Sequence, residues 1–318
     1  MNKIIATVGP SLLHTVKLEE VHTDKNIYRI NGAHGTVEDI EQYILKIKTQ
    51  IPNAQILMDL PGNKVRTANF EYGFIEIEEG KEFTIQFHQM NYKEFFKHLK
   101  VGDEVWANDS IFKFKVININ LEFTQIKFYS YSSGKLLNNK GMHVRGIHKN
   151  IPFLFDKDKE LIKLANRYKL DFVGLSFVRD EKDIKEAKKL IDNSTIISKI
   201  ETLSAVNNLD NILKEVEHIL IDRGDLSTEV GLIQVPKYQK IIIEKAILNQ
   251  NKVFLATQFL KSMELNPIPT IPEIIDMHNT FQTGIYGIQM SEETAIGKYP
   301  KECLEVINNI ISDIEKEW

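Results

Sequence analysis

The fold of this chain is decided by two runs, Thr195-Ile196-Ile197-Ser198-Lys199-Ile200-Glu201 and His218-Ile219-Leu220-Ile221-Asp222-Arg223-Gly224-Asp225. Each is a short, mainly β-branched or aliphatic segment that ends in charged residues, which is typical of a buried strand followed by a polar loop. Residues 204–216 lie between them and carry apolar side chains at helical spacing. A strand, a helix and a second strand in this order predict two parallel strands joined by a helical crossover.

The same alternation extends in both directions along the chain. The predicted strands are residues 3–8, 27–30, 55–60, 172–177, 195–200, 218–221, 252–256 and 287–290. The predicted helices after the third strand are residues 156–168, 181–191, 204–216, 236–249, 271–280 and 300–317. Eight strands joined by crossovers predict an α/β fold of the (β/α)8 or TIM-barrel type, with an open doubly wound sheet as the alternative. The weakest part of this prediction is the first crossover, because residues 10–25 form a poor helix by pattern.

A different pattern interrupts this alternation between about residues 69 and 140. Short strand-like segments follow one another there with almost no helical periodicity, at residues 73–78, 82–88, 104–106, 111–117 and 125–131. We therefore predict a small all-β domain at residues 68–141. It is inserted after the third strand of a barrel that residues 1–67 and 142–318 form.

Composition narrows the class of protein. The chain has 318 residues, of which 42% are apolar and 26% are charged, and its formal net charge is −4. These values exclude a disordered chain and a generally basic nucleic-acid-binding protein. No apolar run approaches the ~20 residues of a membrane span, and no cleavage signal follows Met1–Val8. With Cys303 as its single cysteine, the sequence predicts a cytoplasmic protein without a nucleic-acid or membrane partner.

Charged residues stand at the predicted C-terminal ends of the strands, where the active sites of (β/α)8 barrels lie. Lys199 and Glu201, at i and i+2, point to the same side of their strand. Glu201 and Asp225 come from neighbouring strands and are hard oxygen ligands suited to Mg²⁺. Positive charge for a phosphate or an oxyanion is supplied by Lys199, Arg29 and Arg66. We interpret this set as equipment for phosphoryl transfer, with a purely structural salt bridge between Lys199 and Glu201 as the alternative.

Beyond these residues the chain resembles the pyruvate kinase family. The resemblance rests on stretches in the family's order and approximate spacing, namely Ile5–Pro10, Arg29–Thr36, Ser176–Arg179, Ile197–Glu201, Arg223–Leu226, Ala256–Gln258, Asn266–Thr270 and Ser291–Pro300. It implies that the all-β insertion is a lid domain, with lid motifs at Val101–Asp103, Asn108–Ser110 and Lys140-Gly141. Such a lid is expected to close over the site, with Asp109 meeting a barrel arginine.

The resemblance implies a role for each matched residue. Lys199 would stabilise charge on the transferring phosphoryl group and the enolate, and Glu201 and Asp225 would bind the divalent cation, Mg²⁺ or Mn²⁺. The amides of Gly224 and Asp225, together with Thr257, would hold the substrate carboxylate. Thr257 would also lie near the face at which the proton is delivered. Arg29 would be the catalytic arginine that binds the phosphate. The residues that would bind the nucleotide and its phosphates are Pro10, Asn31, His34, Arg66 and Lys140.

These phosphate-side residues have structural alternatives. Arg29 and Arg66 can pair with local acids, His34 can be a polar residue at a helix start, and Pro10 can form a turn.

The potassium site of the family is altered in this sequence. Members usually have a serine at the position of Ala33 and a threonine at that of Leu60, and both give oxygens to K⁺. Only Asn31 and Asp59 remain as matched side-chain ligands. Members that do not require K⁺ carry a lysine at the position of Lys64. We therefore predict that Lys64 replaces the cation and that K⁺ is not required.

Other departures concern the substrate, the nucleotide and the assembly. Asp222 replaces an alanine beside the carboxylate site, where it would repel an anionic substrate by roughly 1 to 4 kcal/mol at ~4 Å, or pair with Arg223 or Lys199. Asp39 replaces an aromatic residue near the adenine. Further replacements, partly at a subunit contact, are Ser227, Glu292, Ile268 and Ile271. Because the chain ends at Trp318, the resemblance implies that the effector domain is lacking and that the protein is a monomer or homodimer.

Three hypotheses for function follow. The first is phosphoryl transfer between phosphoenolpyruvate and ADP, giving pyruvate and ATP with Mg²⁺. The second is a specialised enzyme that uses the same metal site on a different enol-phosphate, α-keto acid or phosphoryl acceptor. The third is a non-catalytic nucleotide-sensing protein, which the cost of burying a cluster of charges without a ligand disfavours.

Overall fold

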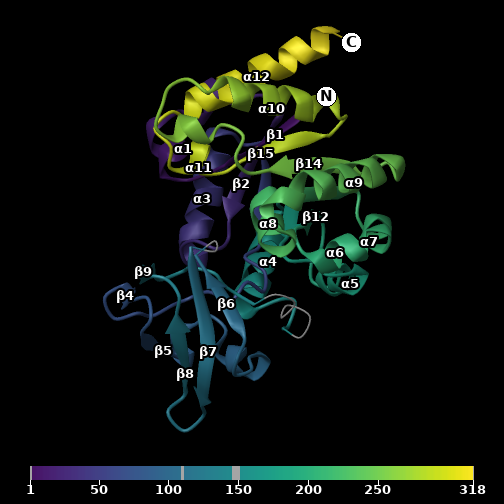
Figure 1. Ribbon diagram of the computed structural model, residues 1–318. Helices are drawn as coiled ribbons and strands as arrows, with labels where there is room; N and C mark the ends of the chain where they lie inside the picture. Colours follow the sequence, from purple (N-terminus) through teal and green to yellow (C-terminus); the bar gives the residue numbers. More distant parts are fainter. Residues whose placement is uncertain (1, 109–110, 145–150, 318) are drawn as a thin grey trace. The chain divides into compact units, whose positions relative to one another are not determined.

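The computed structural model describes residues 2–108, 111–144 and 151–317, and it divides into two compact units (Figure 1). The larger unit consists of Met1–Gly62 and Phe153–Trp318, and the smaller one of Asn63–Pro152. The boundaries predicted from the sequence are 67/68 and 141/142. In the structure Arg66 forms a β-bridge with Gly141 and Thr67 one with Met90, so the segment around them packs within the smaller unit. Asp109 lies outside the described residues.

The larger unit is a closed barrel of parallel strands. Going round the barrel, the strands of the described chain are β1 (Lys3–Thr7), β15 (Gly287–Met290), β14 (Lys252–Ala256), β13 (His218–Asp222), β12 (Thr195–Ile200), β11 (Phe172–Leu175), β3 (Gln55–Asp59) and β2 (Asn26–Asn31). These are the eight predicted segments, and each pairs in parallel with its neighbours. The (β/α)8 prediction is confirmed, and the open doubly wound sheet is wrong.

Helices surround the barrel. In chain order they are α1 (Pro10–Thr15), α2 (Leu18–Val21), α3 (Val37–Gln50), α4 (Asp156–Tyr168), α5 (Glu181–Lys188), α6 (Leu203–Asn207), α7 (Leu209–Glu215), α8 (Arg223–Val230), η4 (Leu232–Gln234), α9 (Val235–Leu248), η5 (Lys261–Glu264), α10 (Ile271–Gln282), α11 (Glu292–Ala295) and α12 (Pro300–Glu317). The first crossover contains only the short α1 and α2, as its poor pattern indicated.

One predicted helix, residues 204–216, is interrupted. It forms α6 and α7, which meet at Asn208. The side-chain amide of Asn208 donates to the carbonyls of Ser204 and Arg179. Asparagine side chains compete with helical hydrogen bonds in this way, which explains why the helix is broken there.

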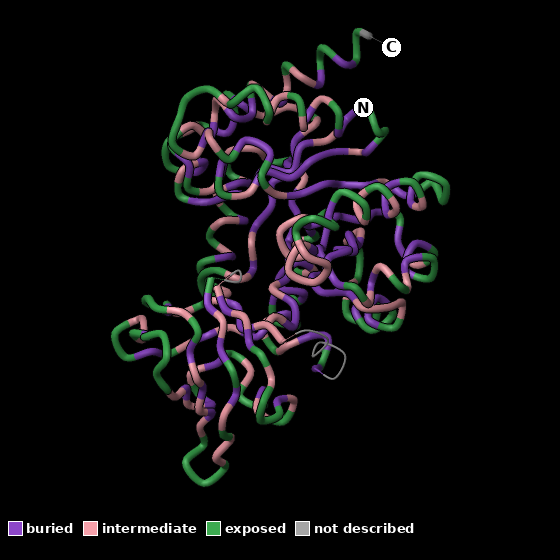
Figure 2. Tube along the Cα trace, in the orientation of Figure 1, coloured by how far each residue is buried: buried purple, intermediate pink, exposed green. Residues whose placement is uncertain are grey.

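Two apolar layers hold the barrel together. Inside it, Ile5, Ile27, Leu57, Phe172, Ile197, Leu220, Phe254 and Ala256 form one cluster. A larger cluster fills the space between the outer faces of the strands and the helices. The strands are therefore buried on both faces, as Figure 2 shows, which is why they are continuous apolar runs rather than alternating ones.

His218 belongs to this interior. The residue is 4% exposed, and its ring lies among the rings of Phe172, Phe254 and Tyr286, with centroid distances of 5.7, 6.2 and 5.8 Å. Burial lowers the pKa of His218 to about 4 from its ordinary value of 6.5. The unfolded chain therefore binds a proton at this position more readily than the folded chain does.

We expect His218 to destabilise the fold in acid. Its neutral form is favoured above pH 6.5, and stability is lost as the pH falls from about 6.5 towards 4 because unfolding then takes up a proton. His218→Phe removes this titration, so the melting temperature of the variant should fall less than that of the parent between pH 7 and pH 5. His14→Phe, at an exposed position, is the control. Parallel pH curves for the parent and His218→Phe would contradict the prediction.

The smaller unit is mainly β-structure. Its five-stranded sheet has the order β10 (Met142–His143), β6 (Glu104–Ala107), β7 (Phe112–Asn120), β8 (Gln125–Ser130) and β5 (Glu82–Gln86), and β4 (Phe74–Ile77) pairs with β9 (Gly134–Leu137). All these pairs are antiparallel. Two 3-10 turns, η1 (Phe87–Gln89) and η2 (Lys93–His98), were not predicted, and neither were β9 and β10. Among the described helices of the chain, none has the length and apolar composition of a membrane span.

Candidate active site

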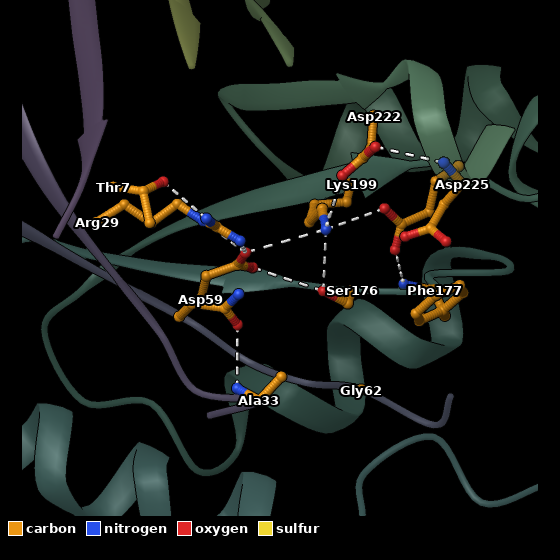
Figure 3. Close-up of polar contacts among 12 residues, drawn as sticks. Thr7, Arg29, Ala33, Asp59, Gly62, Ser176, Phe177, Lys199, Asp222 and Asp225 are labelled. Atoms are coloured by element: carbon orange, nitrogen blue, oxygen red, sulfur yellow. Dashed lines mark hydrogen bonds and ion pairs between the residues drawn. The ribbon is translucent and has the colours of Figure 1, made fainter. Parts of the chain in front are cut away.

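Polar side chains converge at the C-terminal ends of the barrel strands (Figure 3). Thr7 is the last residue of β1, Arg29 lies near the end of β2, and Asp59 ends β3. Ser176 directly follows β11, and Lys199 is the penultimate residue of β12. All five are at most 7% exposed. The barrel therefore holds a buried polar cluster at the end where catalytic residues of this fold are found.

Lys199 is the centre of this cluster. Its Nζ lies 3.0 Å from Oε2 of Glu201, 3.4 Å from Oδ2 of Asp222 and 3.9 Å from Oδ2 of Asp59. It also donates to the hydroxyl of Ser176 at 3.3 Å. The predicted alignment of Lys199 and Glu201 on one side of the strand is therefore what the structure contains. The ammonium is fixed in place from several directions.

The charges in this cluster shift one another's pKa values. Burial alone would lower the pKa of Lys199, but the carboxylates of Asp59, Glu201, Asp222 and Asp225 together raise it above its ordinary value. Burial raises the pKa of Glu201, an effect that the Lys199 charge partly offsets. A raised pKa favours the protonated, positively charged form of Lys199.

Arg29 is held by its own partners. Its Nε and Nη2 donate to Oδ2 of Asp59 at 2.8 and 2.5 Å, and its Nη1 donates to Oγ1 of Thr7 at 2.8 Å. Gly174 makes room for this carboxylate, because a Cβ there would lie 2.8 Å from Oδ1 of Asp59. In this structure Arg29 therefore pairs with an acid, Asp59, as its structural alternative predicted. Pairing also orients the guanidinium at the barrel end.

Glu201 is fully buried, and its two oxygens differ in their contacts. Oε1 accepts a 2.6 Å hydrogen bond from the amide of Phe177, whose φ of +56° is unusual for a residue other than glycine. Oε2 faces Lys199 but has no hydrogen-bond partner among the described residues. A buried carboxylate oxygen without a hydrogen bond is the kind of atom that a bound cation satisfies.

Asp222 lies at the start of α8. Its Oδ1 accepts from the amides of Gly224 and Asp225 at 3.2 and 3.4 Å, so it caps the helix. The hydroxyl of Thr257 accepts from the Gly224 amide as well, at 3.2 Å. Of the two partners that the sequence suggested for Asp222, the structure contains Lys199. Arg223 instead binds Asp276 and the carbonyl of Thr257.

Thr257 itself is strained. Its φ is +73°, and that of the following Gln258 is +59°. A β-branched residue in the left-handed region is a genuine outlier, and such strain is typical of functional sites. The loop after β14 therefore directs the Thr257 hydroxyl to the amino end of α8.

The site contains the donors for a divalent cation. One carboxylate oxygen from each of Glu201, Asp222 and Asp225 lies within 4.8 Å of the others. Oxygen donors of this kind suit Mg²⁺ or Mn²⁺, and Glu201, one of the three residues, has a buried oxygen that lacks a hydrogen bond among the described residues. The residues present therefore fit the predicted cation, with Asp222 beside the two expected ligands.

Other predicted residues have structural roles in this state. Oδ1 of Asn31 accepts from the amide of Ala33 at 3.0 Å. Asp39 forms a capping box with Thr36 at the start of α3, which lowers the pKa of its carboxyl through hydrogen bonds from Thr36. His34 and Pro10 are exposed, and Pro10 begins α1.

Lys64, Arg66 and Lys140 belong to the smaller unit, where the structure brings them close together. Arg66 forms its β-bridge with Gly141, next to Lys140. A Cβ on Gly141 would lie 2.6 Å from Cε of Lys64, so the lysine side chain passes over this glycine. The three predicted cations therefore gather on two paired segments.

Three contributors to the cluster were not predicted in the roles that the structure gives them. One is Thr7, which was quoted only within the stretch Ile5–Pro10 and accepts a hydrogen bond from Arg29. Asp59 was matched only to the potassium site, whereas in the structure it binds Arg29 and lies near Lys199. Ser176 was quoted only as part of a motif, although its hydroxyl joins Lys199 to Asp59. Their positions at the ends of the first, third and fourth barrel strands were the available signal.

Comparisons with known proteins agree with this architecture. The family model described as pyruvate kinase, barrel domain, matches residues 1–304. The chain is 34% identical to a pyruvate kinase of Thermotoga maritima, in an alignment that covers 99% of this chain and 71% of that protein. It is 31% identical to the pyruvate kinase of Geobacillus stearothermophilus and 32% identical to that of Bacillus licheniformis, and covers only 56% and 57% of their lengths.

Proposed function

The chain belongs to the pyruvate kinase family, and we propose that its barrel site transfers a phosphoryl group between phosphoenolpyruvate and ADP with a divalent cation, giving pyruvate and ATP. The observation that carries this proposal is the position of Lys199. Its buried ammonium is held among carboxylates, beside three acidic side chains that can bind a cation. Phosphoryl transfer needs fixed positive charge of this kind more than it needs a base or a nucleophile of the protein.

In this proposal each residue of the site has a separate role, set by its position. Lys199 stays charged and stabilises the negative charge that develops on the phosphoryl group and the enolate. Arg29, oriented by Asp59 and Thr7, binds the phosphate. The amides of Gly224 and Asp225 and the hydroxyl of Thr257 hold the substrate's carboxylate, and Thr257 lies near the face that receives the proton. Because these groups are fixed before the substrate binds, little reorganisation is needed during the reaction.

Glu201 and Asp225 hold the cation, Mg²⁺ or Mn²⁺. When bound, it neutralises phosphoryl oxygens and orients them. The nucleotide and its phosphates are bound by Pro10, Asn31, His34, Arg66 and Lys140. Lys64 supplies the positive charge that K⁺ supplies elsewhere in the family.

Small molecules are the partners in this proposal, and the protein acts as a monomer or homodimer in the cytoplasm. No role for nucleic acid or a membrane is proposed.

The proposal is tested by a coupled turnover assay with phosphoenolpyruvate and Mg²⁺, run with a series of nucleoside diphosphates. Each assay is repeated with K⁺, Na⁺ or a bulky organic cation at matched ionic strength. We expect turnover with ADP at nearly equal rates in all three salts. The reason is that Ala33 and Leu60 offer no side-chain oxygen to K⁺, whereas the ammonium of Lys64 is tethered. Many-fold activation by K⁺ would overturn the assignment of Lys64, and absence of turnover with every diphosphate would overturn the reaction.

Asp222 favours a second candidate function. Its carboxylate accepts from the Gly224 and Asp225 amides that the first proposal assigns to the substrate. An enzyme acting on a different enol-phosphate, α-keto acid or phosphoryl acceptor is consistent with that contact. Binding of Mg²⁺ and phosphoenolpyruvate without turnover of ADP would support this candidate. Failure to bind either would point to the non-catalytic, nucleotide-sensing alternative.

A further inference from the structure

The carboxylate of Asp222 lies where three groups meet. Its Oδ2 is 3.4 Å from Nζ of Lys199, and its Oδ1 accepts from the amides of Gly224 and Asp225. It also offers an oxygen within 4.8 Å of those of Glu201 and Asp225. The two oxygens of a carboxylate offer about four acceptor positions, and the ammonium and the two amides already use three of them, so a bound cation would compete with these contacts. Its position therefore depends on what else occupies the site.

The spacing of these oxygens is close to that of a coordination shell. In an octahedral Mg²⁺ site with bonds of 2.0–2.1 Å, neighbouring oxygens are about 3 Å apart and opposite ones about 4.2 Å. Oxygens within 4.8 Å of one another can reach these distances by side-chain rotation. The Asp222 side chain is 11% exposed and that of Glu201 is 0% exposed, so these two carboxylates are largely shielded from water, whereas Asp225 is half-buried.

A second observation points to a ligand at this position. Oε2 of Glu201 is fully buried and accepts no hydrogen bond among the described residues, and Glu201 is one of the three residues whose carboxylates are grouped here. Its ion pair with Lys199 balances charge but leaves that oxygen without a hydrogen bond. A cation between Glu201, Asp222 and Asp225 would satisfy it.

We propose that Asp222 is a third carboxylate ligand of the divalent cation, and that cation binding draws it away from Lys199 and from the first amides of α8. This inference rests on the proposed cation site. It also gives Asp222 a role in controlling when an anionic substrate can bind. Without the cation, the internal carboxylate occupies the donors that an anionic substrate needs, and with the cation those donors become available. A carboxylate-bearing substrate therefore binds after the cation.

Mn²⁺ binding in the absence of any substrate tests the first half of the proposal. Free Mn²⁺ is measured by electron paramagnetic resonance for the parent, Asp222→Asn and Asp222→Ala. Asparagine is a good N-cap, so Asp222→Asn keeps the start of α8 while it removes the charge. We expect both variants to bind Mn²⁺ at least about tenfold more weakly, since even residues that only support ligands affect affinity by about 10- to 100-fold. Asp210→Asn, an exposed carboxylate on α7, should bind like the parent.

The second half is tested by the amide resonances of Gly224 and Asp225. On addition of Mg²⁺ to the parent, both amide protons should move upfield because they lose the Asp222 carboxylate as their acceptor. In Asp222→Asn the change should be small. Equal Mn²⁺ affinity in the parent and both Asp222 variants would overturn the proposal while leaving the proposed function intact. A parent that binds no Mn²⁺ would overturn both this proposal and the proposed function. Unshifted Gly224 and Asp225 amides in a Mg²⁺-bound parent would overturn the inference that the cation draws Asp222 away from them.

Discussion

Lys199→Met should reduce phosphoryl transfer by roughly 10² to 10³ at saturating substrate and Mg²⁺, because a preorganised charge of this kind acts on the transition state. The ammonium is held by Glu201, Asp222 and Ser176, which fix its position. Methionine has a similar length and fills the buried space without the charge. The measurement is kcat at saturation, taken with the thermal midpoint of each protein.

Cation binding, unlike turnover, should not be weakened in Lys199→Met. Lys199 lies within 3.4 Å of two of the three carboxylates that could hold it, and an ammonium repels a divalent cation. Lys199→Met should therefore bind Mn²⁺ at least as tightly as the parent, although its turnover is lost. Lys240→Met, at an exposed lysine of α9, is the matched control and should behave like the parent. A folded Lys199→Met protein with near-normal kcat would show that the catalytic charge lies elsewhere.

Loss of Lys199 also has a structural consequence that the thermal midpoint reports. Glu201 and Asp222 would then face one another in a buried space without the ammonium between them, whereas Asp59 would keep its ion pair with Arg29. Breaking a buried charge pair typically costs about 3 to 5 kcal/mol of stability. Mg²⁺ should restore part of this loss in the variant, because it supplies positive charge to the same carboxylates.

The barrel could be predicted from the sequence because its strands are buried on both faces. Runs such as Ile219-Leu220-Ile221 contain no alternation, are too short for helices and recur at the spacing of crossovers. The short α8 could not be predicted in this way. Only Leu226 of this helix is buried, so it presents no apolar stripe, and it is organised by the Asp222 cap.

The candidate site was predictable to the extent that it follows from position along a strand. Lys199 and Glu201 share a side because they are two residues apart, and the ion pair follows from that spacing. The contact of Asp59 with Lys199 joins residues that are far apart in the sequence, and it depends on β3 and β12 both pairing with β11, which lies between them. Likewise, a choice between Arg223 and Lys199 as the partner of Asp222 required the direction in which the end of β13 turns into α8.

Glu201→Gln should shift the Mg²⁺ requirement of turnover upward by about 10- to 100-fold. The glutamine carbonyl can keep the hydrogen bond from the Phe177 amide, so the loop after β11 should hold its conformation. Its amide group, however, replaces an oxygen that lies 3.0 Å from Nζ of Lys199. If this amide faces the Lys199 ammonium, two hydrogen-bond donors oppose each other. The cation also loses one of the three charged ligands, Glu201, Asp222 and Asp225.

The measurement is the rate as a function of Mg²⁺ at fixed substrate, together with Mn²⁺ affinity without substrate. Asp225→Asn should shift both in the same direction, whereas Glu215→Gln, which removes a surface partner of Lys185 and Lys188, should shift neither. The rate at saturating Mg²⁺ separates two explanations. If Glu201 acts through the cation, high Mg²⁺ should recover much of the rate of Glu201→Gln, whereas it cannot recover that of Lys199→Met. If both Glu201→Gln and Asp225→Asn keep the parent's Mg²⁺ dependence, the cation is bound by other residues, and the assignment of the acidic cluster fails.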